Sequence, residues 1–207
     1  MAKVRDIINE IKTLERELLL ELQKEDREFY YTIKKKKVFF DEATKKEHKK
    51  ISRKIHTYLL ESSPWSFIAA PIIWFCVVPA LFMDLVISFY QLICFPIYNI
   101  PKVKRSDHIV IDHQSLGYLN TIEKFNCIYC SYFNGLIAYV REIAARTEQH
   151  WCPIKHARKL DSTHSRYHKY LEYGDHNEFK KHFEDISNDY DDLTGEANET
   201  PNRTDPP

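Results

Sequence analysis

The stretch "WSFIAAPIIWFCVVPALFMDLVISFYQLICFPIY", Trp65 to Tyr98, decides the fold of this 207-residue chain. Its first nineteen residues carry no charge, Asp84 follows, and fourteen uncharged residues complete it. About 20 apolar residues in a helix cross a bilayer, so the stretch is long enough for one crossing and short of two crossings with a turn. Three prolines can bend a helix here: Pro71, Pro79 and Pro96.

Basic residues flank the apolar stretch on both sides, with six between positions 45 and 54 and three more at Lys102, Lys104 and Arg105. The positive-inside rule then favours both flanks on the cytoplasmic side. We therefore predict a mainly α, membrane-anchored protein with a hydrophobic helical hairpin or re-entrant insertion. The alternative is one long kinked span with residues 85–98 along the interface. In either form, Asp84 is interpreted as the boundary of the first span, and an ion or proton path is the alternative.

Composition excludes several classes of protein. The four glycines are far apart, so the chain contains no dinucleotide fingerprint and no P-loop. The first thirty residues are charged throughout and do not form a secretory signal peptide. Residues 31–60 carry ten Lys/Arg against three acids, and the basic segment 34–54 favours anionic lipid head groups over nucleic acid as a partner.

Four regions follow from this pattern. Residues 1–62 form an amphipathic and basic helical region, in which a helix over 2–28 either folds onto its own chain or pairs as a coiled coil. Residues 63–100 are the membrane-embedded segment. Residues 101–175 form a soluble helical module with a short strand at 108–112 and helices over about 133–150 and 153–172. Residues 176–207 form an acidic tail that we expect to be disordered.

A cluster of cysteine and histidine marks the soluble module. Cys127 and Cys130 form a C-x-x-C pair, and Cys152 precedes a proline, with His156 four residues further on. Three thiolates and one imidazole are a ligand set of structural zinc sites, so the spacing predicts a zinc site. The site closes only if the chain folds back near Asn134 or if the intervening helix is shorter than predicted, because a straight helix would separate its two halves by about 30 Å.

Other interpretations of the cysteines stay open. The cysteine–proline pair also suits an iron–sulfur cluster, and Cys127 with Cys130 could form a redox-active dithiol. Alternatively, the thiols are buried small hydrophobes. A weaker metal candidate is the set Asp161, His164 and His168, which would share one stripe of a helix over 153–172.

The segment "KFNCIYCSYFNGLIAYVREIAARTEQHWCPIKHARK", Lys124 to Lys159, resembles a family of uncharacterised bacterial membrane proteins that carry a similar apolar block. The resemblance covers roughly residues 64–160, implies a bacterial inner-membrane location and implies no activity. From the residues we predict a zinc-stabilised membrane scaffold or interaction protein, which binds a protein partner or a second copy of itself. The alternative is a membrane-associated metalloenzyme or redox protein that uses the cysteine cluster.

Overall fold

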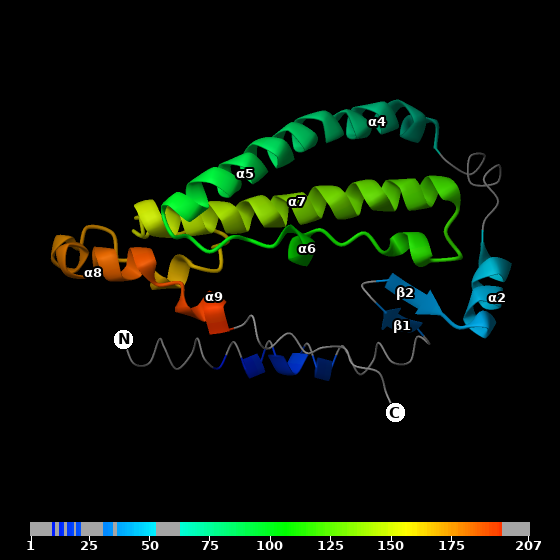
Figure 1. Cartoon of the computed structure of the whole chain (residues 1–207). Helices are drawn as coiled ribbons and strands as arrows, with labels where there is room; N and C mark the ends of the chain where they lie inside the picture. Colours follow the sequence, from blue (N-terminus) through cyan, green and yellow to red (C-terminus); the bar gives the residue numbers. More distant parts are fainter. Residues whose placement is uncertain are drawn as a thin grey trace. The chain divides into compact units, whose positions relative to one another are not determined.

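The computed structural model describes residues 10, 13–14, 16–18, 20–21, 31–34, 37–52 and 63–195. The chain divides into two compact units, one of residues 1–54 with 115–120 and one of residues 55–114 with 121–207. The described residues are mainly helical, as predicted, and a two-stranded sheet is the exception. Figure 1 shows the elements in chain order.

The first unit contains a β-hairpin and a basic helix. Strands β1 (Tyr31–Lys34) and β2 (Lys37–Phe40) pair antiparallel, with Tyr31 opposite Phe40. Helix α2 (Glu42–Ile51) begins after Asp41, whose carboxylate accepts a hydrogen bond of 2.8 Å from the backbone N–H of Thr44. This is an ordinary N-cap, which satisfies a free N–H of the first turn. The basic helix agrees with the prediction from the sequence, and the hairpin was not predicted.

The predicted helix over 2–28 lies largely outside the described residues. Those positions between 10 and 21 that the structure does describe are helical. The coiled-coil alternative stays a prediction. The continuation of the basic helix through residues 53–60 also lies outside the described part of the chain.

The apolar stretch is one long helix in two parts, α4 (Pro64–Phe75) and α5 (Val77–Ile97). Cys76 keeps helical backbone angles between them. Cys76 lies three residues before Pro79, whose ring crowds the carbonyl of Phe75 and which has no N–H to donate to it. The predicted hairpin is therefore wrong, and the long kinked helix is the form that the protein adopts.

The chain reverses directly after α5 in a tight cap. Asn99 adopts a positive φ of 55°, and the N–H of Ile100 donates to the carbonyl of Phe95 over 2.9 Å. This is a Schellman motif, in which the apolar residue after the left-handed position packs on the last turn. Both Ile100 and Phe95 are buried and belong to the hydrophobic core, so the cap is also part of the core.

Helix α7 (Thr121–Trp151) is the centre of the second unit. It runs parallel to α4–α5, since Trp74 stacks on Phe125 near the start and Tyr98 contacts Trp151 at the end. The chain between them, here named the return segment (Pro101–Gln114), runs back along α7 and contains α6 (Arg105–His108) (Figure 1). The predicted helix over 133–150 is confirmed, but it begins twelve residues earlier.

Gly135 allows the return segment to approach α7 closely. A Cβ atom at this position would lie 2.6 Å from the carbonyl oxygen of His108 and 2.9 Å from the Cα atom of Ile109. The backbone of the return segment therefore packs directly on α7 at this point, and residues 109–112 are irregular. The predicted strand at 108–112 is wrong.

The second predicted helix, over 153–172, is also wrong. Apart from the short turn η3 (Tyr167–Lys169), this region is irregular and closes on itself through a parallel bridge between Ile154 and Leu171. The N–H of Lys155 donates to the carbonyl of Leu171 over 2.7 Å, and the N–H of Leu171 donates to the carbonyl of Pro153 over 2.8 Å. These bonds replace the helical ladder that Pro153 was expected to start.

The predicted disordered tail is wrong for residues 176–195. They form α8 (His176–Asn188) and α9 (Asp191–Gly195), and residues 196–207 lie outside the described part. Tyr190 is buried in the core and Leu193 packs against it, so two apolar side chains anchor an otherwise acidic segment. The core itself lies between α5 and α7, with Phe95, Leu136 and Ile143 fully buried.

Candidate functional site

The apolar helix α4–α5 has two different faces. One face packs against α7 and the return segment, with Ala80, Gln91 and Phe95 buried. The other face is an uninterrupted run of exposed, large apolar side chains, here named the outer stripe. Its members on α5 are Val78, Leu81, Phe82, Leu85, Val86, Phe89, Leu92, Ile93 and Ile97. On α4 the exposed apolar residues are Trp65, Phe67, Ile68, Ile72, Ile73 and Phe75.

The polar side chains of α5 are on the packed face. Asp84, Ser88 and Gln91 are each at least half-buried and are spaced four and three residues apart, which places them on one side of a helix. This distribution is the reverse of a surface helix of a soluble protein, which turns its polar residues outward. The residues of α5 that are classed as exposed are therefore all apolar.

Asp84 is the centre of a polar cluster at the middle of the apolar helix. Its carboxylate accepts hydrogen bonds from the Arg105 guanidinium at 2.6 Å, from the Tyr132 hydroxyl at 2.9 Å and from the Ser88 hydroxyl at 3.2 Å. The Asp84 side chain is 14% exposed and that of Arg105 is 49% exposed. The helix continues through Asp84, so no helix ends there, and its interpretation as the boundary of a first span stays a prediction.

The hydroxyl of Tyr132 is held in its protonated, donating form. Burial, together with the hydrogen bond to the Asp84 carboxylate, raises the pKa of Tyr132 to about 12. At neutral pH the cluster therefore contains one negative and one positive charge with a neutral donor. Such a cluster is a compensated ion pair and joins α5, α7 and the return segment.

Gln91 joins the same three elements about two turns further along α5. Its amide nitrogen donates to the Tyr139 hydroxyl over 2.9 Å and to the carbonyl of Val103 over 3.3 Å. Its amide oxygen accepts from the N–H of Val103 over 2.7 Å. Through these bonds the Gln91 amide pairs with both backbone groups of Val103 and holds the return segment against α5 and α7.

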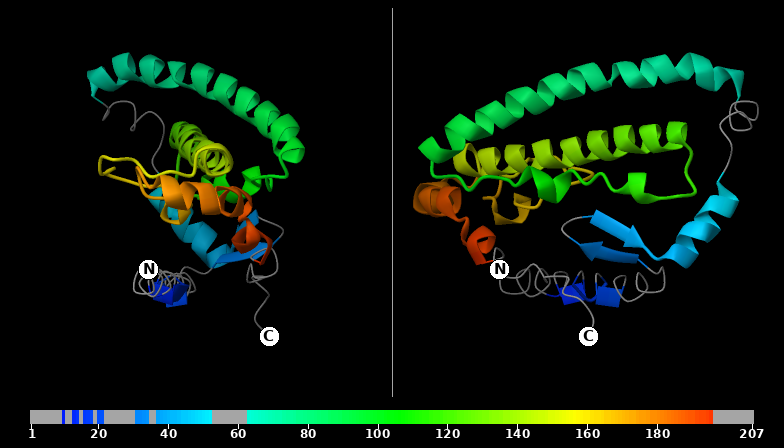
Figure 2. Two further views of the ribbon diagram at one scale, coloured as in Figure 1. Left: turned by 90° about the vertical axis from the view of Figure 1, so that its left-hand side faces the viewer. Right: turned by 45° about the vertical axis from the view of Figure 1, so that its right-hand side comes forward.

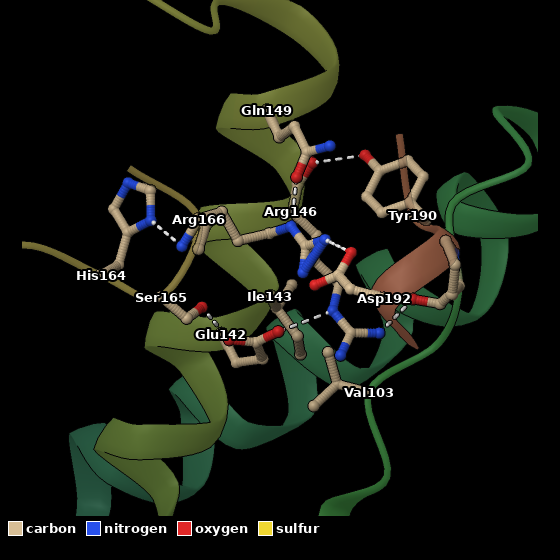
Figure 3. Close-up of polar contacts among 12 residues, drawn as sticks. Val103, Glu142, Ile143, Arg146, Gln149, His164, Ser165, Arg166, Tyr190 and Asp192 are labelled. Carbon is tan, nitrogen blue, oxygen red and sulfur yellow. Dashed lines mark hydrogen bonds and ion pairs between the residues drawn. The ribbon is translucent and has the colours of Figure 1, made fainter. Parts of the chain in front are cut away.

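A second polar network lies at the end of α7 and holds α8–α9 in place. Figure 3 shows Arg166 between Gln149 of α7 and Asp192 of α9. Arg166 is 2% exposed, donates to the Gln149 side-chain oxygen and pairs with the Asp192 carboxylate at 2.7 Å. Lys169 pairs with the same carboxylate at 2.8 Å.

The charges of this network compensate each other. Burial alone would raise the pKa of the Asp192 carboxyl, but hydrogen bonding from Lys169 and the charge of Arg166 lower it below its ordinary value of 3.8. Arg146 is similarly placed between Glu142 at 2.8 Å and the carbonyl of Pro101 at 2.7 Å. The network is a structural clamp, because its buried guanidinium groups are satisfied by groups of the chain itself.

The structure does not bring the four residues of the predicted zinc site together. Cys127 and Cys130 lie in the second and third turns of α7, and Cys152 follows its last residue. Twenty-five residues of continuous helix separate Cys127 from Cys152 by about 37 Å. His156 is in the irregular region, where its backbone N–H donates to the Tyr167 hydroxyl over 2.8 Å.

The weaker candidate set is also not on one helix. Asp161 is exposed in a bend, His164 pairs with Glu148 at 2.9 Å, and His168 lies in the turn η3. Within the described ranges, no group of three or more His, Cys, Asp or Glu side chains is placed to hold a metal ion. The zinc and iron–sulfur interpretations stay predictions from spacing that this geometry does not support.

Comparison with known proteins adds no further constraint, since no protein-family model, curated protein or solved structure matches the chain significantly. The candidate site is therefore defined by its own geometry: the outer stripe of α4–α5 and the Asp84 cluster behind it.

The partners of Asp84 are not evident from the sequence around it. The residue is a lone acid in the apolar stretch, and Arg105 follows it by 21 positions and Tyr132 by 48. One signal was present in the sequence, because Asp84, Ser88 and Gln91 recur at helical spacing within an otherwise apolar stretch. That spacing indicates a face that meets other polar groups of the protein.

Proposed function

We propose that this protein is a membrane-anchored scaffold or interaction protein, in which α4–α5 attaches the chain to a lipid bilayer. The single observation that carries the proposal is the outer stripe. Soluble monomers rarely expose a contiguous apolar patch beyond a few hundred Å². A helix of 34 residues, with 6% of its most apolar window buried, is long and apolar enough to enter a membrane.

The basic helix α2 adds an electrostatic contribution to this attachment. Lys45 and Lys50 pair with acids of their own helix at 2.7 and 2.6 Å, while Lys46 and Lys49 are exposed on it. Each basic residue near an anionic surface contributes about 1 kcal/mol. Binding should therefore be tighter to vesicles with anionic lipid than to neutral vesicles, and this difference should shrink in high salt.

The compartment we propose is the bacterial cytoplasmic membrane, and this rests only on the resemblance of residues 64–160 to bacterial membrane proteins. A zinc or iron–sulfur cofactor is not part of the proposal, since α7 separates its predicted ligands. Partners are proposed for the charged surface of the second unit, on the side away from the outer stripe.

Vesicle flotation of the full chain tests the proposal. The test variant replaces three outer-stripe residues by serine, Phe82, Leu85 and Phe89, which are 70%, 68% and 62% exposed. Each such side chain contributes about 1.5–3 kcal/mol when it leaves water, so the variant should bind at least a hundredfold more weakly.

The matched control replaces three exposed apolar residues outside the helix by serine, Val110, Ile111 and Tyr173. This control should float like the wild type. Equal flotation of wild type and test variant, or a wild type that stays with the soluble fraction, would contradict the proposal.

A further inference from the structure

We infer that α4–α5 lies in the plane of one leaflet, with its outer stripe in the hydrocarbon, and does not cross the bilayer. The inference rests on the proposed membrane attachment and specifies its geometry. The occupant of the outer stripe is the acyl-chain region of a single leaflet.

Length is the first argument. Thirty-four helical residues extend about 50 Å, while the hydrocarbon core is about 30 Å thick. Containing the whole helix in a crossing would require a tilt of about 53°, and transmembrane helices tilt by about 0–40°. An in-plane helix has no such length limit.

The neighbours of the helix supply the second argument. Contacts with α7 extend from Trp74 to Tyr98, so a crossing of α4–α5 would take α7 with it. In its last third, α7 carries Arg141, Glu142 and Arg146, and Arg141 is exposed. If α7 crossed the bilayer with α4–α5, the exposed Arg141 guanidinium would lie on a membrane-crossing helix, where a charge is unfavourable.

The return segment gives the strongest constraint. Arg105 reaches Asp84 at the middle of the long helix, and the neighbouring Lys104 and Asp107 are exposed. A crossing centred on Asp84 would place these two exposed charges near the bilayer mid-plane, at about 2.5–3.5 kcal/mol for each charged residue. The in-plane orientation leaves them on the water side of α5.

The shape of the second unit fits this orientation. Figures 1 and 2 show α4–α5 as a curved outer layer whose concave side covers α7, with the return segment on the same inner side. Trp65 at one end and Trp151 at the other are 76% and 55% exposed. Tryptophan prefers the membrane–water interface, and an in-plane helix places both residues at the same interface.

A groove on the outer surface of α5 is suited to an acyl chain. It is lined by Leu81, Leu85, Phe89 and Leu92 together with Asp84 and Ser88, whose polar atoms are hydrogen-bonded within the Asp84 cluster. The apolar lining follows the helix axis, which in this orientation lies parallel to the membrane surface. Flexible acyl chains of one leaflet can fill such a shallow groove.

Depth-dependent fluorescence quenching in vesicles tests the inference. The native tryptophans Trp65, Trp74 and Trp151 are replaced by phenylalanine, and one new tryptophan is introduced at Phe67, Phe82 or Leu92. These three positions are outward and 54%, 70% and 60% exposed, so the changes leave the core intact. Lipids brominated near the head group and lipids brominated near the chain end serve as shallow and deep quenchers.

The in-plane helix predicts that the shallow quencher is the better one for all three tryptophans, at a common depth of about 5–10 Å below the head groups. A crossing predicts a gradient, in which the Phe82→Trp variant is quenched best by the deep lipid. That gradient would overturn the inference while leaving the proposed attachment intact. Variants and wild type that all fail to float would instead overturn the proposed function.

The unmodified protein provides an independent measurement. In sealed inside-out membrane vesicles of expressing bacteria, an added protease should cut both before residue 63 and within residues 99–120. In sealed spheroplasts, where the opposite face is exposed, it should cut neither. Cleavage of the two flanks from opposite faces would establish a crossing and overturn the inference.

Discussion

Asp84 shows how a single charge is accommodated within an apolar helix. The carboxylate accepts hydrogen bonds from three side chains, one of them a guanidinium, and it lies on the face that meets α7. Removing one partner of such a pair leaves the other without compensation, whereas removing both can be nearly neutral. The residue is therefore expected to stabilise the joint between α5, α7 and the return segment.

We expect Asp84→Leu to lower the free energy of unfolding by about 1–3 kcal/mol, because the Arg105 guanidinium and the Tyr132 hydroxyl lose their acceptor. The double variant Asp84→Leu with Arg105→Met should recover part of the loss. Thermal unfolding in detergent micelles, followed by circular dichroism, measures both. Asp161→Asn, at an exposed carboxylate in a bend, is the control and should match the wild type. An Asp84→Leu variant as stable as the wild type would mean that the cluster contributes nothing.

At the scale of elements, α9 is attached by charge, and its attachment should depend on pH. The Asp192 carboxyl has a pKa below 3.8 in the folded chain, because Lys169 and Arg166 outweigh the effect of burial. A lowered pKa gives stability that is fully present above the unfolded value and is lost as pH falls through the folded value. The stabilisation should therefore be constant near neutral pH, begin to fall near pH 4 and be lost as the pH falls further through the folded pKa.

The measurement is the thermal midpoint between pH 3 and pH 7 for wild type and Asp192→Asn. Between pH 5 and pH 3 the thermal midpoint should fall further for the wild type than for the variant, because the asparagine side chain of the variant does not titrate. Two parallel curves would show that Asp192 makes no pH-dependent contribution. Asp161→Asn again serves as the control and should follow the wild-type curve.

The continuity of α7 has a direct chemical test. In a variant that keeps only Cys127 and Cys130, a short bifunctional thiol reagent should link the two, since three residues along a helix share a face. In a variant that keeps only Cys127 and Cys152, the same reagent should give no intramolecular link across about 37 Å. Linkage in the second variant would show that α7 folds back near Asn134, as the predicted zinc site requires.

Element by element, the sequence predicted what depends on local pattern. The apolar helix and the helix over 133–150 follow from hydrophobicity and periodicity, and both exist. Whether residues 65–98 fold as a hairpin depends on α7, where Phe125 stacks on Trp74 and Tyr132 donates a hydrogen bond to Asp84. No local sequence pattern contains this information. The helix predicted after Pro153 failed because tertiary hydrogen bonds to Leu171 displaced it.

At the scale of the whole molecule, the apolar helix is part of the core as well as the proposed attachment. Phe95 is fully buried, Ala80 is 3% exposed, and both contact the cluster formed by Leu136, Tyr139 and Ile143. Most single-span anchors can be removed to release a soluble domain. Here removal of the helix would uncover the core side of α7.

We therefore expect a fragment of residues 99–207 to be aggregated or unfolded in the absence of detergent. Size-exclusion chromatography and hydrogen exchange of the fragment provide the measurement, with the full chain in detergent as the reference. Slow exchange in α7 of a monomeric fragment would contradict this expectation and would show that α4–α5 is dispensable for folding.

The order of these contacts along the chain has a consequence during synthesis. Asp84 and the rest of α5 leave the ribosome before the residue that is 48 positions later, Tyr132, has been added. At about 5–20 residues per second, this interval lasts roughly 2–10 s. During that time the nascent helix has both its apolar stripe and its unpaired carboxylate exposed. On the proposed attachment, a membrane surface near the ribosome would cover the stripe during this interval, and the carboxylate would gain its partner on α7 only when that helix emerges.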